Sequence, residues 1–123
     1  MGGVGICGSD LHYYHIGRVG NAVVREPMIL GHELSGVVDA IGPGVSGLVP
    51  GQKVCGILQT TQNFAVVSIS ITATDECGTC GYCRSGHQNL CPDLRYYGSA
   101  ARTPHVQGIM VEYPMVQARQ CVA

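Results

Sequence analysis

The chain has 123 residues, enough for one domain with a modest core. Only 12% of the residues are charged, the net charge is −1 and the few basic residues are scattered, which argues against a patch for nucleic acid or a membrane surface. The 18 glycines and 6 prolines favour a turn-rich, mainly β domain over a helical bundle.

The first half of the chain predicts one short helix and two strands. The helix spans residues 9–15, with Ser9 as its N-cap. A strand follows at residues 34–41 and ends in a glycine–proline turn at 42–44. A second strand is predicted at residues 51–58. Strands therefore dominate this half of the chain.

The second half combines strand patterns with a cysteine-rich loop. Apolar and polar residues alternate at 63–74, which is the period of a half-buried strand. Residues 77–104 show no periodicity and are expected to form a loop that needs a metal to hold it together. A final strand is predicted at 105–116, interrupted at Gly108 and placed at a sheet edge by Pro114.

Two stretches, at residues 3–8 and 42–47, spell the G-x-G-x-x-G pattern of a dinucleotide-binding loop. Such a loop needs a buried strand before it and, after it, a helix whose N-terminal N–H groups hold the pyrophosphate. The first stretch has too few residues before it to form a strand, and Pro50 and Gly51 disfavour a helix after the second. We therefore predict that neither stretch binds a dinucleotide.

Four of the seven cysteines follow the spacing C-x2-C-x2-C-x7-C, at Cys77, Cys80, Cys83 and Cys91. Four thiolates suit a tetrahedral zinc ion, and a site filled by four sulfurs has no open position and is structural. An iron–sulfur cluster is the alternative, although the bacterial motif has three residues rather than seven before its fourth cysteine. Unligated, buried thiols are a further alternative.

A second set of possible zinc ligands consists of Cys7, His32 and Glu33. Adjacent residues of a regular strand point to opposite faces, so His32 and Glu33 can share an ion only at a bend, which Gly31 permits. The simpler alternative is a hydrogen-bonded His–Glu pair without a metal.

The stretches GICGSDLH and GHELSGVVDAIGPGV, together with the cysteine cluster, resemble the zinc-containing medium-chain alcohol dehydrogenase family. The second stretch fits the zinc signature of that family. Residues 5–20 and 84–108 are similar to its polyol and sugar-acid branch, the sorbitol, xylitol and L-idonate 5-dehydrogenases, and within that branch we favour the L-idonate type. The resemblance extends over most of the chain.

The resemblance implies a mainly β fold, a partial GroES-like open barrel with a zinc-stapled lobe at 77–91. It implies that a catalytic zinc is held by Cys7, His32 and Glu33, and a structural zinc by Cys77, Cys80, Cys83 and Cys91. Ser9 and His12 match the positions that pass the alcohol proton away. In such enzymes zinc stabilises the alkoxide and the hydride goes to NAD(P)⁺.

Two departures from the family pattern affect the expected activity. A segment from about residue 55 to 76 stands in place of a short connector, and it carries no charge from residue 54 to 74. We interpret it as intron read-through or an alternative exon. No strand–loop–helix unit for NAD(P) is found, so the cofactor would need a downstream Rossmann domain. Residues 1–123 are thus expected to be a single partial domain that is inactive alone.

The expected substrate is a small polyol or sugar acid of the L-idonate or sorbitol type, and members of the family are dimers or tetramers. The competing hypothesis is a non-catalytic zinc-binding or oligomerisation fragment. No apolar run has the length of a membrane span and no signal-peptide pattern opens the chain, so we expect a cytoplasmic protein with reduced cysteines.

Overall fold

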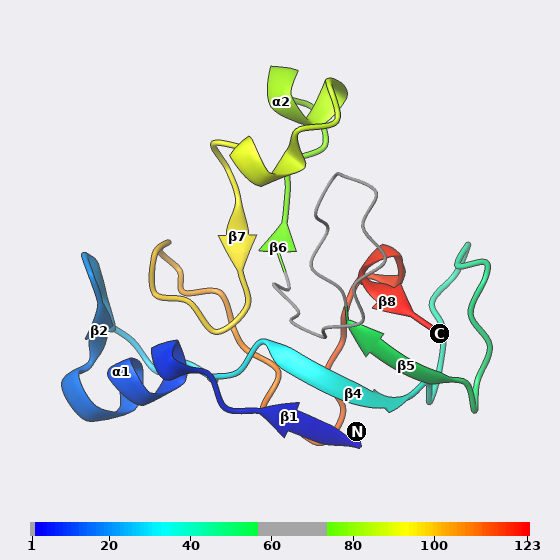
Figure 1. The fold of residues 1–123 in the computed structure, drawn as a ribbon, viewed down its shortest axis with the longest axis horizontal. Helices are drawn as coiled ribbons and strands as arrows, with labels where there is room; N and C mark the ends of the chain where they lie inside the picture. The colour runs from blue at the N-terminus through cyan, green and yellow to red at the C-terminus, as the bar shows by residue number, and fades with distance from the viewer. Residues whose placement is uncertain (1, 57–73) are drawn as a thin grey trace.

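The computed structural model describes residues 2–56 and 74–123 of the chain (Figure 1). Its main sheet is antiparallel and has the strand order β1-β4-β5-β8. These strands are β1 (Gly3–Gly5), β4 (Glu33–Val37), β5 (Lys53–Gly56) and β8 (Cys121–Val122). The expected mainly β fold is confirmed by these strands and by two further small sheets.

Helix α1 (Gly8–Ile16) confirms the helix predicted at 9–15. Its N-cap is Cys7 rather than Ser9, because the backbone of Cys7 is extended and its N–H donates to the carboxylate of Asp10 at 3.0 Å. The helix ends at Ile16, and its C-cap is Gly17, which adopts a left-handed conformation with φ of 69° and donates its N–H to the Tyr13 carbonyl.

The remaining elements are short. A hairpin of β2 (Arg18–Val19) and β3 (Ala22–Val23) follows α1. Strands β6 (Thr74–Asp75) and β7 (Arg95–Tyr96) pair with each other and carry the lobe that projects away from the main sheet in Figure 1. The lobe contains α2 (Gly81–Arg84) and the 3₁₀ turn η1 (Gln88–Leu90), and a second such turn, η2 (Ala118–Gln120), precedes β8.

The apolar core of the main sheet is small. Leu34 and Ile109 are buried together, with Ile109 only 1% exposed, and Tyr97 and Val116 pack against them. A second buried contact joins α1 to the loop after β7, where the hydroxyl of Tyr13 accepts a hydrogen bond from the backbone N–H of Ala100 at 3.1 Å. The first contact fixes the start of β4 and the second fixes α1.

The strands predicted at 34–41 and 51–58 are confirmed as β4 and β5. β4 ends earlier than predicted, β5 begins two residues later, and residues 57–58 lie outside the described residues. Except for Thr74 in β6, the strand predicted at 63–74 lies outside the described residues, as does most of the segment from 55 to 76. The loop predicted at 77–104 contains α2, η1 and β7 in addition to turns.

The strand predicted at 105–116 is wrong. Val106 forms an isolated bridge with Ser99, after which the segment leaves any strand pairing. The N–H of Gly108 donates to the Ile29 carbonyl at 2.7 Å, so its backbone crosses an irregular segment instead of a strand. The last strand is β8, further along the chain. Among residues 2–56 and 74–123, no helix is long and apolar enough to cross a membrane.

Candidate metal centres

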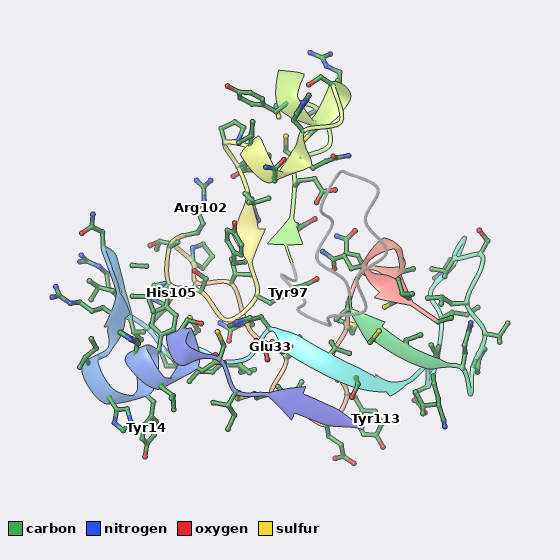
Figure 2. All side chains as sticks on the ribbon, viewed as in Figure 1. Tyr14, Glu33, Tyr97, Arg102, His105 and Tyr113 are labelled. Carbon is green, nitrogen blue, oxygen red and sulfur yellow. The ribbon has the colours of Figure 1, made fainter. Side chains whose placement is uncertain are left out.

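The structure brings together Cys7, His32 and Glu33, which the sequence had offered as ligands of a single ion. One donor atom from each side chain lies within 4.8 Å of the other two, and all three residues are half-buried. Cys7 immediately precedes α1, and Glu33 is the first residue of β4, where Figure 2 labels it. The start of the helix and the start of a strand therefore form the cluster.

Two glycines make this arrangement possible. Gly31 has a φ of 93°, a left-handed conformation that side chains rarely adopt, and the bend there places His32 before the regular strand. Gly5 is the β1 partner of Glu33, and a Cβ on Gly5 would overlap the Glu33 carboxylate. The missing side chain of Gly5 leaves room for that carboxylate.

Asp10 was not assigned a role from the sequence, yet it connects the two halves of the cluster. It is 3% exposed, and its carboxylate accepts hydrogen bonds from the N–H groups of Cys7 and Gly31, both at 3.0 Å. One of its oxygens also lies 3.8 Å from Nδ1 of His32. An acidic residue three positions after an N-cap is the sequence signal that could have identified it.

Ser9 and His12, the expected proton-transfer pair, both lie on α1. Residues three apart in a helix share a face, so the two side chains are neighbours on its surface. Ser9 is half-buried and His12 is exposed, which orders them from the interior toward solvent.

The chemistry of the donor set fits a zinc ion. Sulfur, imidazole nitrogen and carboxylate oxygen are all zinc donors, and catalytic zinc sites use three protein ligands and leave a fourth position open. In such sites a carboxylate commonly accepts a hydrogen bond from the second ring nitrogen of a ligating histidine. Asp10 lies close to that position, 3.8 Å from Nδ1 of His32.

The second cluster lies in the lobe, where the structure gathers Cys77, Cys80, Cys83 and Cys91 with their sulfurs within 4.8 Å of one another. The sulfurs of Cys77 and Cys83 are 4.0 Å apart, close to the separation of about 3.8 Å that a tetrahedral zinc with Zn–S bonds of about 2.3 Å requires. The cluster can therefore hold a zinc ion with little rearrangement.

Backbone N–H groups surround this cluster. The N–H of Cys80 donates to the sulfur of Cys77 at 3.3 Å, and the N–H of Cys83 donates to Cys80 at 3.4 Å. Hydrogen bonds from Thr79 and Cys80 lower the pKa of the Cys77 thiol to about 6. Burial raises the pKa of the Cys83 thiol to about 12. In the metal-free lobe one sulfur is thus prepared as a thiolate while another keeps its proton.

The first G-x-G-x-x-G stretch has a different context from the one expected. Residues 3–5 form β1 themselves, and α1 begins at Gly8, so a strand and a helix do flank the loop. However, β1 is an antiparallel edge strand, and the Glu33 carboxylate lies against Gly5, where a pyrophosphate would meet negative charge. No helix follows the second stretch, at 42–47, as predicted.

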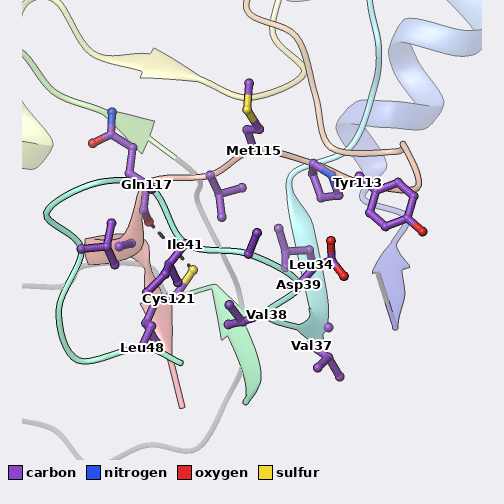
Figure 3. A pocket seen from close by; sticks show the side chains of 17 residues that line it. Leu34, Val37, Val38, Asp39, Ile41, Leu48, Tyr113, Met115, Gln117 and Cys121 are labelled. Atoms are coloured by element: carbon purple, nitrogen blue, oxygen red, sulfur yellow. Dashed lines mark hydrogen bonds between the residues drawn. The ribbon is translucent and has the colours of Figure 1, made fainter. Parts of the chain in front are cut away.

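A hollow of about 720 Å³ lies on another part of the molecule, between the segment after β4 and the segment that leads into β8 (Figure 3). Its lining is mostly apolar and includes Val38, Ile41, Leu48 and Met115. None of the Cys7, His32 or Glu33 side chains lines it. The hollow and the Cys7, His32 and Glu33 cluster are therefore separate features of the molecule.

A known protein family matches the chain over its whole length. Residues 1–123 match the family described as the alcohol dehydrogenase GroES-like domain. L-idonate 5-dehydrogenase (NAD(P)(+)) of Escherichia coli K12 is 42% identical over 118 residues, 96% of this chain and 29% of that enzyme. Sorbitol dehydrogenase of Bacillus subtilis is 43% identical over 110 residues, 89% of this chain and 26% of that enzyme.

The crystal structure of the Escherichia coli L-idonate 5-dehydrogenase shares the fold, with a TM-score of 0.78 and 41% identity over 97% of this chain and 30% of the other. The chain spans less than a third of the length of these relatives. The resemblance noted in the sequence is confirmed: the chain belongs to the GroES-like domain family of zinc-type alcohol and polyol dehydrogenases.

Proposed function

We propose that this chain is the substrate-binding, zinc-dependent domain of an NAD(P)-linked dehydrogenase. Its reaction is the oxidation of a secondary hydroxyl on a small polyol or sugar acid, of the L-idonate or sorbitol type named in its relatives. The observation that supports this most directly is the gathering of Cys7, His32 and Glu33 at the start of α1 and β4. Such a three-ligand cluster is typical of a catalytic centre, not of a structural one.

Each residue has a defined task in this proposal. Cys7, His32 and Glu33 hold the zinc ion, which when bound acts as a Lewis acid toward the substrate hydroxyl. Ser9 accepts the hydroxyl proton and passes it to His12, whose imidazole can exchange it with solvent because the side chain is exposed. Asp10 keeps the helix and the bend at Gly31 in register.

The hydride acceptor is assigned to NAD(P) bound by a further domain, because neither glycine stretch of the chain fits a dinucleotide. The 123 residues alone are therefore expected to be inactive. The assembly is proposed to be a dimer or tetramer located in the cytoplasm, and the seven free thiols suit such a reducing compartment.

Cobalt substitution tests the centre without needing the cofactor. We expect two Co²⁺ ions per chain, one with the strong sulfur-to-cobalt absorption of four thiolates and one with the weaker bands of a mixed centre. Sorbitol or L-idonate should shift only the mixed-centre bands, since only that centre has a free coordination position. Cys7→Ser is the matched variant and should abolish both those bands and their response.

The competing hypothesis, a non-catalytic zinc-binding or oligomerisation fragment, predicts a single Co²⁺ per chain, lost in Cys80→Ser. Finding that pattern in the wild-type chain would end the proposal of a catalytic domain. NAD⁺-dependent turnover of sorbitol or L-idonate by the pure 123-residue chain would contradict the proposed need for a further domain.

A further inference from the structure

The segment from residue 105 to 110 crosses tightly over the segment that leads into His32. Figure 2 labels His105 on the loop beside α1 and Glu33 at the start of β4, the two regions that the crossing connects. None of these six residues belongs to either metal cluster. Their contacts with residues 25–31 nevertheless determine the path of the backbone that carries His32.

His105 holds the beginning of that path. Its side chain is 1% exposed, and both ring nitrogens are used: Nε2 accepts the N–H of Arg25 at 2.9 Å, and Nδ1 donates to the Arg102 carbonyl at 2.8 Å. Its backbone N–H donates to the carboxylate of Glu26. A buried imidazole with both nitrogens satisfied is costly to replace, because each lost bond leaves a buried polar group unpaired.

Gly108 and its neighbours hold the end of the path. The N–H of Gly108 donates to the Ile29 carbonyl at 2.7 Å, and the next two N–H groups donate to the carbonyls of Gly31 and Leu30 at 3.1 and 3.0 Å. The Gln107 side chain accepts the Ile29 N–H at 2.9 Å. A Cβ on Gly108 would overlap the backbone of Ile29 and Leu30, so only glycine permits this approach.

We propose that residues 105–110 act as a strap that positions His32 for metal binding, with His105 and Gly108 as its two positioning residues. The strap fixes residues 25–31 from one side, while Asp10 binds the Gly31 N–H from the other. Gly31 is thereby held in its left-handed conformation, and the direction in which His32 leaves it is set. This inference deepens the proposed function, since it rests on His32 being a zinc ligand.

Gly108→Ala tests the strap, and Gly42→Ala is its matched control because a Cβ on Gly42 meets nothing within 4 Å. The readout is Co²⁺ titration followed by absorption, which separates the mixed centre from the four-thiolate lobe. We expect Gly108→Ala to weaken Co²⁺ binding at the mixed centre by about tenfold or more, as outer-sphere changes do. The lobe bands should be unchanged, and amide exchange of the metal-free variant should be faster at residues 29–33.

If the amides of β4 and β5 lose their protection from hydrogen exchange in Gly108→Ala, that variant has not folded. A second pair of variants then provides the test. His105→Gln keeps an acceptor for the Arg25 N–H, whereas His105→Leu removes it, so the first should retain the mixed-centre bands and the second should weaken them. The strap is refuted if Gly108→Ala and His105→Leu both bind Co²⁺ at the mixed centre as tightly as Gly42→Ala. A wild-type chain without mixed-centre bands would instead refute the proposed function.

Discussion

The pKa values of two cysteine thiols in the lobe are shifted in opposite directions. The pKa of Cys77 is lowered to about 6 by hydrogen bonds from Thr79 and Cys80, while burial raises that of Cys83 to about 12. The thiolate is the reactive form of cysteine. Without a metal, Cys77 is therefore more readily a thiolate than Cys83. The sequence spacing alone, which treats the four positions alike, could not have distinguished the two.

Metal-free protein treated with iodoacetamide at pH 7 should be alkylated faster at Cys77 than at Cys83. The rate at Cys77 should fall as the pH drops below about 6, because the thiolate is then protonated. Peptide mass spectrometry at several pH values measures both rates. Zinc added beforehand is the control and should protect all four lobe cysteines. Equal rates at Cys77 and Cys83 at pH 7 would show that the hydrogen bonds do not act as described.

At the scale of secondary-structure elements, the sequence predicted whether a segment is a helix or a strand better than it predicted where the element ends or what it pairs with. Helix α1 and strands β4 and β5 were found because each follows a local pattern. The segment 105–116 also has an apolar, strand-like composition, but its N–H groups bond an irregular segment about 80 residues earlier. Such a long-range crossing leaves no periodic signal. The N-cap was misassigned because the Asp10 carboxylate favours Cys7 over Ser9.

Asp10 is the residue on which the junction of α1 with the bend before β4 depends. Asp10→Asn keeps the shape but replaces one acceptor oxygen with an NH₂ group that faces a backbone N–H. We expect the free energy of unfolding to fall by roughly 1–3 kcal/mol, the cost of an unpaired buried polar group. Urea denaturation followed by circular dichroism measures it. Asp39→Asn, at an exposed position, should leave stability unchanged; an equal loss in both variants would contradict the argument.

For the whole molecule, residue chemistry alone predicted the parts of the candidate site, whereas only the family resemblance implied that they assemble. The sequence offered Cys7, His32 and Glu33 as ligands, but whether a strand start and a helix start would meet depends on the pairing of β1 with β4. The lobe is different: its four cysteines lie close in sequence, and its elements pack mainly on one another. The lobe should therefore respond to metal as a separate unit.

Cys80→Ser should prevent zinc from binding to the four-cysteine cluster, and this change tests whether the lobe is a separate unit. Hydrogen exchange should become faster for residues 77–91, because the thiolate–metal bonds reinforce the short elements α2 and η1 and the turns between them. The amides of β4 and β5 should keep their protection, since their ladder does not involve the lobe. If the β4 and β5 amides exchange at the same increased rate as those of the lobe, then the two parts fold as one unit.

The buried contact of Tyr13 with Ala100 has an optical consequence. The chain has no tryptophan, so its near-ultraviolet absorption comes largely from six tyrosines. Tyr13 is 8% exposed, whereas Tyr14 beside it is 79% exposed. These two neighbouring residues therefore differ in solvent exposure, since the Tyr13 ring is buried and the Tyr14 ring is in water. If α1 separates from the loop after β7, the absorption of Tyr13 should change while that of Tyr14 stays the same. Tyrosine absorption can therefore be used to follow the position of α1 without any added dye.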